Sequence, residues 1–491
     1  MLRGRPWMPA AAVLLIVPGA FGEPGAGTNA FPASDPLGRA VEVSTNQLQS
    51  PLSPAGAGGV ARQIPAAPRG AAQTAEQRRR LREARTGREW FPETPPVLMP
   101  YLANLDEYGN TAVQPGAAMT NDPVVKGVQA AKYDLSEAGL RYGLYQSFTL
   151  VSLSGAAQGA SALQYYTATW VGKWAVTQVP DAGRAGWVST EINVQQGLSV
   201  ASRSQTVQEN AGSVVNPQAT VFGPNGIWIS ELAWQQSFLD GKLVVVAGEV
   251  DQSNYLDANA YANNSQGQFL NSAFVNSGVL PLPFNNLGLN LQYQPSEWGY
   301  VMLGTGALNV GPGSSPFDHL GFRNWAWLLE AGWTPSDLAG LGPGAYRLQP
   351  FVATVEGTTQ GGLGLNCQQQ LGTNSPFAWF GRFGFGGTWI TADGASVQSA
   401  TGLVVQGPLA AAGWVPKLSN DFLGAAFVWT RPSKAFGPAY HSNEYGFEGT
   451  YALQLTPLVS VQPDLQVLWN PAANPVADRT VVFQMQFNML W

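Results

Sequence analysis

The chain has 491 residues, of which 45% are hydrophobic and only 11% are charged. Soluble proteins usually carry about a quarter charged residues, so the composition argues against an ordinary water-facing surface. From Met99 onward, 14 Lys and Arg stand against 24 Asp and Glu, a net −10 that argues against nucleic acid as a partner. The single cysteine, Cys367, excludes an intramolecular disulfide and a cysteine metal cluster.

The first 22 residues have the pattern of a signal peptide. Arg3 and Arg5 precede an uncharged run centred on residues 10–17, and small residues follow at 20 and 22. The alternative is a membrane anchor, but the apolar run is well short of the ~20 residues that a spanning helix needs. We therefore expect residues 1–22 to be a signal peptide and the protein to be exported.

Residues 23–98 are rich in Ala, Pro and Gly and lack sustained periodicity, which predicts a linker. Within it, a capping-box pattern at 74–77 begins a short basic helix over 74–85. One interpretation is a solvated helix. The other is contact with an anionic envelope component such as peptidoglycan or lipopolysaccharide, which would make this segment a tether.

Alternation of apolar and polar residues dominates the chain from about Leu140 to its last residue. For example, Trp325 and Trp327 oppose Glu330, and runs of this kind are separated by turn dipeptides. A soluble sandwich or propeller also alternates, but it would show many charges on its outer face. Here the polar faces carry mainly uncharged side chains, as expected of a water-filled lumen. We therefore predict a transmembrane antiparallel β-barrel domain over residues 99–491, surrounded by outer-membrane lipid, with about 16 strands.

The C-terminal stretch supports this prediction independently. Phe483, Phe487 and Trp491 alternate with polar residues such as Gln484 and Gln486, and the run ends on an aromatic residue. A barrel without edges needs its last strand to pair with its first, because unpaired backbone groups in hydrocarbon are costly. We expect a strand at the C-terminus and a bacterial outer-membrane location.

The stretch from Gly226 to Pro283 predicts a hairpin followed by a long loop. Strict alternation puts Trp228 with Leu232 and Trp234 on one face, and Ile229 with Glu231 on the other. A turn at Asp240-Gly241 leads into a second strand over 243–250. The amide-rich loop over 251–276 is too long to be a mere connection, and we expect it to fold inward as the constriction of a pore.

Two alternatives for this loop remain open. It can be an external surface loop, or it can hold a weak calcium site through Asp251, Asp257 and Asn259. The spacing of these three residues does not match an EF-hand loop. Because they lie in the expected constriction, we also include them among the candidate solute contacts.

Strand parity predicts which charged side chains face the lumen. The candidates are Lys173, Glu231, Glu249, Arg382, Glu444 and Glu448. Such groups can replace the hydrating water of a sugar, since a pore selects by diameter, hydrogen-bonding groups and field. The alternative for each is an ordinary solvated lumen residue far from the narrow point.

We expect neither catalysis nor a bound cofactor or metal. The two histidines, His319 and His441, lie in predicted loops without a nucleophile elbow or metal-ligand spacing around them. An esterase-like partnership of His441 with Ser442, or of His319 with Asp318, is the alternative.

Several short motifs resemble the carbohydrate-selective porins of the OprB type. They comprise WQQSFLDGKL at 234–243, GEVD at 248–251, DANAYA at 257–262, QFLNSAF at 268–274, YQP at 293–295, WGY at 298–300, EGTY at 448–451, LTP at 455–457, VQPDLQV at 461–467 and NP at 470–471. The resemblance covers about 180–491 and implies an outer-membrane barrel of about 16 strands through which sugars diffuse passively.

The chain also departs from this family pattern. Tyr255 and Tyr261 stand where Phe is preferred, the last residue is Trp491 rather than Phe, and residues 99–180 align poorly. These departures bear on the range of solutes, and we expect small neutral sugars because the charge density is low. A general diffusion porin, or a structural barrel that tethers the envelope, remains the alternative, and a homotrimer remains open.

Overall fold

The computed structural model describes residues 139–490 and the isolated positions Gly127, Ala131 and Leu135. Within 139–490 it leaves out residues 178–185, 223–224, 240–241, 309–314, 318–322, 374, 388–393, 415–420, 437–438 and 457. The predicted signal peptide, linker and basic helix over residues 1–98 lie outside the described residues, as do His319 and Trp491.

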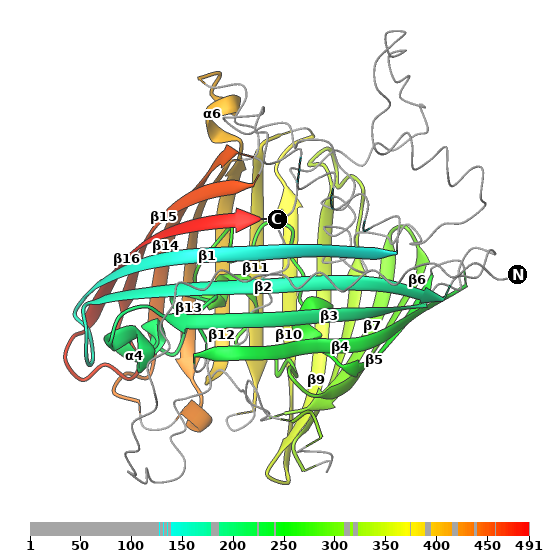
Figure 1. Ribbon diagram of the computed structural model, residues 1–491, viewed down its shortest axis with the longest axis horizontal. Helices are drawn as coiled ribbons and strands as arrows, with labels where there is room; N and C mark the ends of the chain where they lie inside the picture. The colour runs from blue at the N-terminus through cyan, green and yellow to red at the C-terminus, as the bar shows by residue number, and fades with distance from the viewer. Residues whose placement is uncertain are drawn as a thin grey trace, which may run out of the picture. The chain divides into compact units, whose positions relative to one another are not determined.

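The described residues form one closed antiparallel barrel of sixteen strands, in which each strand pairs with its neighbours in the chain (Figure 1). This confirms the predicted fold class. The strands are β1 (Leu140–Ser154), β2 (Ala162–Thr177), β3 (Gly186–Gly197), β4 (Gly226–Phe238), β5 (Leu243–Glu249), β6 (Leu287–Ser296), β7 (Gly299–Ala307), β8 (Trp325–Trp333), β9 (Gly344–Val355), β10 (Thr358–Gln370), β11 (Phe377–Gly386), β12 (Ala395–Gln406), β13 (Phe422–Pro432), β14 (Glu444–Thr456), β15 (Val459–Trp469) and β16 (Arg479–Leu490).

The barrel closes through the first and last strands. Residues Tyr145 to Ser154 of β1 pair with Leu490 to Val481 of β16 in an unbroken antiparallel register. This closure leaves neither strand as an edge, which satisfies backbone groups that hydrocarbon could not. The predicted C-terminal strand is therefore confirmed, and its partner is the first strand of the wall.

Alternating side chains face opposite sides of the wall, as the sequence predicted. On β8, Trp327 and Trp333 are exposed on the outer face, whereas Glu330 is buried inside. On β11, Phe383 is exposed and Arg382 is buried in the same way. The barrel thus has an apolar outer surface and a polar inner one, which suits a lipid surround and a hydrophilic interior. Among the described residues, no helix is long and apolar enough to cross a membrane.

The strand parity predicted for β4 is wrong at its beginning. Glu231 pairs with Glu191 while Ile229 pairs with Ile192, so Ser230 is an extra residue, a β-bulge. Ser230 and Glu231 are both buried on the inner side, and the alternation changes phase there. As a result Trp228 faces inward, and Ile229 lies on the outer face with Leu232 and Trp234.

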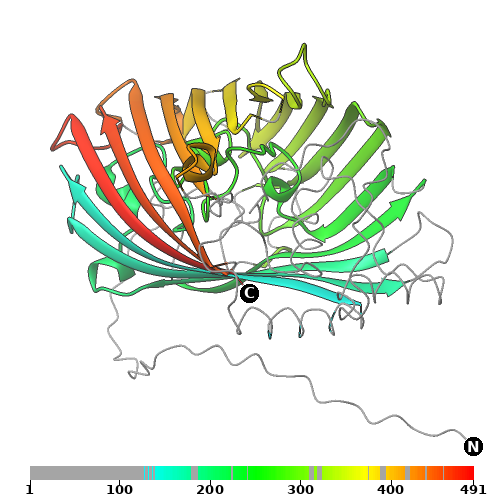
Figure 2. The same cartoon turned by 90° about the horizontal axis from the view of Figure 1, so that it is seen from above.

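Two long connections at the same end of the barrel fold back into its interior (Figure 2). Inner segment 1 comprises residues 205–222 between β3 and β4, and inner segment 2 comprises residues 250–286 between β5 and β6. Almost every residue of both is buried. The helices are η1 (Ala201–Arg203) and α4 (Val207–Ala211) in the first connection, η2 (Gln252–Asn254) and α5 (Ser272–Val275) in the second, and α6 (Pro408–Ala411) and η3 (Lys434–Phe436) elsewhere.

Local sequence explains the fold of inner segment 1. Thr206 and Glu209 form a capping box that begins α4. Gly212 ends the helix at φ 64°, a left-handed conformation that glycine adopts without steric cost. The chain therefore turns sharply and enters the interior as an irregular run of bends and turns, whose valines pack on the inner wall.

A cluster of phenylalanines packs inner segment 2 against the wall. The ring centroid of Phe269 lies 5.4 Å from that of Phe274, 5.3 Å from Phe380 on β11 and 5.5 Å from Phe422 on β13. The wall makes room at Gly424, where an added Cβ would lie 2.6 Å from Cζ of Phe269. The interior of the barrel is thus partly filled by a packed apolar core.

Candidate functional site

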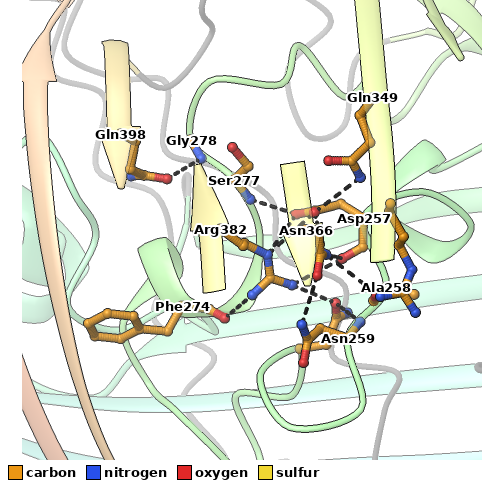
Figure 3. A network of polar contacts seen from close by, with 12 residues as sticks. Asp257, Ala258, Asn259, Phe274, Ser277, Gly278, Gln349, Asn366, Arg382 and Gln398 are labelled. Atoms are coloured by element: carbon orange, nitrogen blue, oxygen red, sulfur yellow. Dashed lines mark hydrogen bonds and ion pairs between the residues drawn. The ribbon is translucent and has the colours of Figure 1, made fainter. Parts of the chain in front are cut away.

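A buried ion pair joins inner segment 2 to the inner face of the wall (Figure 3). Arg382 of β11 donates from Nε to Asp257 Oδ2 at 3.2 Å and from Nη1 to the carbonyl of Phe274 at 2.6 Å. Asp257 also accepts from Asn366 Nδ2 at 2.6 Å and from the Ser277 amide at 2.7 Å. The pair therefore joins two points of the inner segment to β10 and β11.

A second set of charges adjoins this ion pair on the wall. Tyr300 of β7 donates to Glu330 of β8 at 2.6 Å and accepts from Arg347 Nε of β9 at 2.9 Å. Glu330 Oε2 accepts from the backbone amide of Asp257 at 2.8 Å and from Gln349 Nε2 at 2.8 Å. Because each charge faces an opposite charge or several donors, the local field is largely neutralised.

Acidic side chains gather at the opposite wall. Glu231 of β4 accepts from Tyr255 Oη at 2.8 Å and from Asn254 Nδ2 at 3.1 Å, and the same Asn254 amide donates to Glu191 at 3.1 Å. Inner segment 2 is thus hydrogen-bonded to β3 and β4 on one side and to β10 and β11 on the other. It spans the interior from wall to wall.

Two further charged residues, one basic and one acidic, lie on this side of the interior. The Lys173 ammonium lies 3.7 Å from the ring centroid of Trp187, a cation–π contact inside the barrel. Asp251, at the start of inner segment 2, accepts from the Ser253 amide at 2.8 Å. Burial, together with the nearby Glu191 and Glu231 carboxylates, raises the pKa of Asp251 well above its ordinary value of 3.8.

Most of the predicted lumen-facing residues occupy inner-face positions on their strands. Lys173, Glu231, Arg382, Glu444 and Glu448 are all buried on the inner side of their strands, with at most 3% of their surface exposed. Their contacts go chiefly to the inner segments and the neighbouring wall. Contact with a solute stays a prediction for each of them.

The lumen-facing position of Glu249 stays a prediction. In the ladder Glu249 stands opposite Leu232 on β4 and Leu287 on β6, and Leu232 is exposed on the outer face. Gly248 precedes it at φ 144°, at the very end of the strand. The alternation of β5 therefore gives Glu249 the outward register, although its side chain is only 9% exposed.

The predicted loop folds inward, and it is longer than expected. Asp251, Asp257 and Asn259 all lie in inner segment 2, and Asn259 Nδ2 donates to Asn366 Oδ1 at 2.7 Å. The alternative of an external loop is therefore wrong. The calcium alternative stays untested: Asp257 already accepts from Arg382, Asn366 and the Ser277 amide, and among the described residues no group of three or more His, Cys, Asp or Glu side chains could hold a metal ion.

Several important groups were not among the candidates. Glu191 and Glu330 lie on the polar faces that alternation assigns to the lumen, so parity alone was enough to find them. Arg347 lies on β9, a strand whose pattern is interrupted by Pro350. Inner segment 1 gave no sequence signal for its inward path beyond its length and its valines.

The histidine that the structure describes lacks the setting of a catalytic residue. His441 Nε2 lies 3.5 Å from Oδ1 of Asp478, which is almost fully exposed in the β15–β16 connection. The Ser442 hydroxyl accepts a hydrogen bond from Asn443 at 3.2 Å. The structure shows no hydrogen bond between the Ser442 hydroxyl and the His441 ring. The geometry offers no oriented nucleophile and base at this position.

A closed sixteen-stranded barrel with an apolar outside, a polar inside and connections folded into its interior defines a porin of the bacterial outer membrane. The model of the carbohydrate-selective porin, OprB family, matches residues 182–393 and 365–489. The chain belongs to this family, which confirms the resemblance seen in its motifs, and the family and fold point to a channel rather than an enzyme.

Known porins are similar to this chain in fold or in sequence. The high-pH structure of Pseudomonas putida OprB is similar with a TM-score of 0.61 and 15% identity, covering 77% of this chain and 99% of that one. Porin AaxA of Chlamydia muridarum is 23% identical over 53% of this chain and 55% of the relative, and that of Chlamydia abortus is 25% identical over 53% and 56%. The matched region thus spans about half the length of these relatives.

Proposed function

We propose that this protein lets small neutral carbohydrates diffuse passively across the outer membrane, with inner segment 2 as the constriction. The observation that carries the proposal is the wall-to-wall path of this segment. It is hydrogen-bonded to Glu231 on one side of the barrel and to Asn366 and Arg382 on the other. Any solute that traverses the barrel has to pass this segment.

The chemistry of the interior supports a neutral, hydroxyl-rich solute. The inner faces of β15 and β16 carry mainly amides, with Asp464 as an acidic residue among them. The amides are Gln462, Gln466, Gln484 and Gln486, which donate to the inner segments, and Asn488. Amides both donate and accept, as sugar hydroxyls do, so an amide-rich interior suits the exchange of a sugar's water contacts for hydrogen bonds with the pore. Such exchanges favour weak, repeated interactions, and weak interactions allow rapid passage.

The charges of the interior support the same proposal. Asp257 is paired with Arg382, and Glu330 lies 3.8 Å from Arg347. Paired charges in a confined space attract a single anion or cation much less than unpaired ones do. We therefore expect discrimination by size and hydrogen bonding rather than by net charge. Two expectations remain predictions: a homotrimer, and envelope contact through the basic segment over 74–85.

The proposal is tested by liposome swelling with the purified full chain. Neutral sugars of rising size are compared with an anionic and a cationic amino acid of similar size. We expect rapid entry of monosaccharides, a sharp decline for larger sugars, and no strong preference between the two amino acids. Equal entry of all solutes up to a large size would point to a general diffusion porin. No entry of any solute would contradict the proposal.

A further inference from the structure

Two glutamates on one strand hold both inner segments in place. Glu444 and Glu448 lie on the inner face of β14, with Gly446 between them on that face. At most 1% of either side chain is exposed. Glu444 contacts inner segment 1 and Glu448 contacts inner segment 2, so a single strand reaches both.

Four donors converge on the Glu444 carboxylate. Its Oε2 accepts from the backbone amides of Val214 at 3.0 Å and Ala472 at 2.7 Å, and its Oε1 accepts from the Val215 amide at 3.4 Å. The Ser213 hydroxyl also donates to Oε1. A carboxylate offers acceptors only, and it satisfies buried N–H groups more strongly than a neutral acceptor does. Glu444 therefore ties inner segment 1 both to the wall and to the β15–β16 connection.

Glu448 holds inner segment 2 in the same manner. Its two oxygens accept from the backbone amides of Leu270 at 2.6 Å and Asn271 at 2.9 Å. These two amides directly follow Phe269, whose ring packs in the apolar core. Asp464 of β15 lies beside Glu448, so this carboxyl group has an acidic neighbour.

The two inner segments are also joined to each other. The Ala219 amide donates to the carbonyl of Leu270 at 2.7 Å, and the Ser272 amide donates to the carbonyl of Asn216 at 2.8 Å. The Asn216 amide in turn donates to the Ser272 hydroxyl at 3.0 Å. Movement of one segment away from the wall would therefore break hydrogen bonds of the other.

We infer that Glu444 and Glu448 are positioning residues that set the width of the constriction by fixing the two inner segments as one unit. The inference rests on the proposed function, because it names what shapes the passage that solutes use. It assigns these carboxylates a role other than solute contact, since their oxygens face backbone amides and their surface is covered. Glu444 acts on inner segment 2 through inner segment 1.

The test uses Glu444→Gln in the full chain. The substitution keeps the volume but turns an N–H₂ group toward donors, so that at least one amide loses its acceptor. Ser213→Ala is the milder variant, which removes one donor from the segment and leaves the wall intact. Thr167→Val is the matched control, because Thr167 is also buried on the inner face and its hydroxyl has no hydrogen-bond partner among the described residues. Glu297→Gln, in the exposed β6–β7 turn, controls for the loss of one negative charge.

Two readouts separate positioning from general destabilisation. Hydrogen exchange should accelerate about tenfold or more at the Val214 and Val215 amides in Glu444→Gln, and less in Ser213→Ala. Liposome swelling should show larger sugars entering faster relative to a monosaccharide, while the melting of the barrel strands is little changed. Both controls should behave as wild type in both assays.

The outcomes also distinguish this inference from the proposed function. If Glu444→Gln admits sugars with the wild-type size cutoff and its hydrogen exchange is unchanged, the positioning role is overturned. The proposed function would still stand in that case. If Glu444→Gln fails to fold, unchanged exchange and cutoff in Ser213→Ala would overturn it. If wild type admits no sugar, the proposed function fails, whereas accelerated exchange in the variants would still support the anchoring of the segments.

Discussion

Replacing Phe269 by alanine should loosen the constriction without dismantling the barrel. The Phe269 side chain has no exposed surface, and it contacts three other rings, two of them on the wall. Truncating a buried phenylalanine to alanine costs about 3 to 5 kcal/mol. The wall strands keep their own ladders, so most of this cost falls on the docking of inner segment 2.

The expected size of the effect follows from this cost. Each 1.4 kcal/mol is a factor of ten in an equilibrium, so about 3 kcal/mol raises the undocked population of the segment roughly a hundredfold. In single-channel recordings from planar bilayers, Phe269→Ala should show added noise and brief openings of higher conductance. In liposomes it should admit sugars that the wild type excludes.

The matched control is Phe383→Ala on β11. This side chain is exposed on the outer face, so its loss changes the lipid-facing surface and leaves the interior as it was. The control should give wild-type recordings. A folded Phe269→Ala protein with wild-type conductance, noise and size cutoff would refute the claim that the phenylalanine cluster holds the constriction.

Three further predictions concern the interior. Arg382→Met leaves Asp257 buried without its ion pair and should destabilise the folded protein by about 3 kcal/mol in chemical unfolding from vesicles. Adding Asp257→Asn should recover much of that loss. Gly424→Val puts a side chain where Phe269 now packs, and should reproduce the leaky recordings of Phe269→Ala. Asp251 has a raised pKa, so the folded protein holds its proton more tightly than the unfolded chain does. Stability should therefore rise as the pH falls from this raised pKa toward 3.8, and Asp251→Asn should flatten that slope.

Each of these predictions has a clear contrary result. Wild-type stability of Arg382→Met would mean that the ion pair contributes nothing, and no recovery in the double variant would mean that the missing packing of Arg382 is the cause. Wild-type recordings from folded Gly424→Val, without added noise or brief openings of higher conductance, would show that the wall has room for a larger side chain. If stability depends on pH in Asp251→Asn as it does in wild type, the dependence belongs to another carboxyl group.

Strand alternation predicted the wall because its physical basis is local. A strand with lipid on one side and polar groups on the other has to alternate apolar and polar residues, and the sequences of β8 and β11 show this alternation. The same logic placed Glu231, Glu444 and Glu448 on the inner side. It failed at Ser230, because a bulge adds one residue without a turn dipeptide or a proline to mark it.

The interior was harder to predict because its contacts join distant parts of the chain. The length and amide content of the loop after β5 indicated an inward path, and the structure has one. No pattern in the sequence, however, connects Glu448 with Leu270 or Asp257 with Arg382, which meet only when the barrel is closed. The same holds for Gly424: the reason for a glycine at this position is visible only in the folded protein, where Phe269 packs against it.

The pairing of β1 with β16 has a consequence for assembly of the barrel. Ser147 and Asn488, which are hydrogen-bonded across this seam, are 341 positions apart in the sequence. Until the last strand arrives, both margins of the sheet expose unpaired backbone groups that invite association with other chains. Contacts so remote in sequence form slowly, because the chain has to be ordered between them first. Biogenesis of this protein therefore has a vulnerable stage that ends only when β16 pairs with β1, and shielding the open sheet until then is a requirement of the fold.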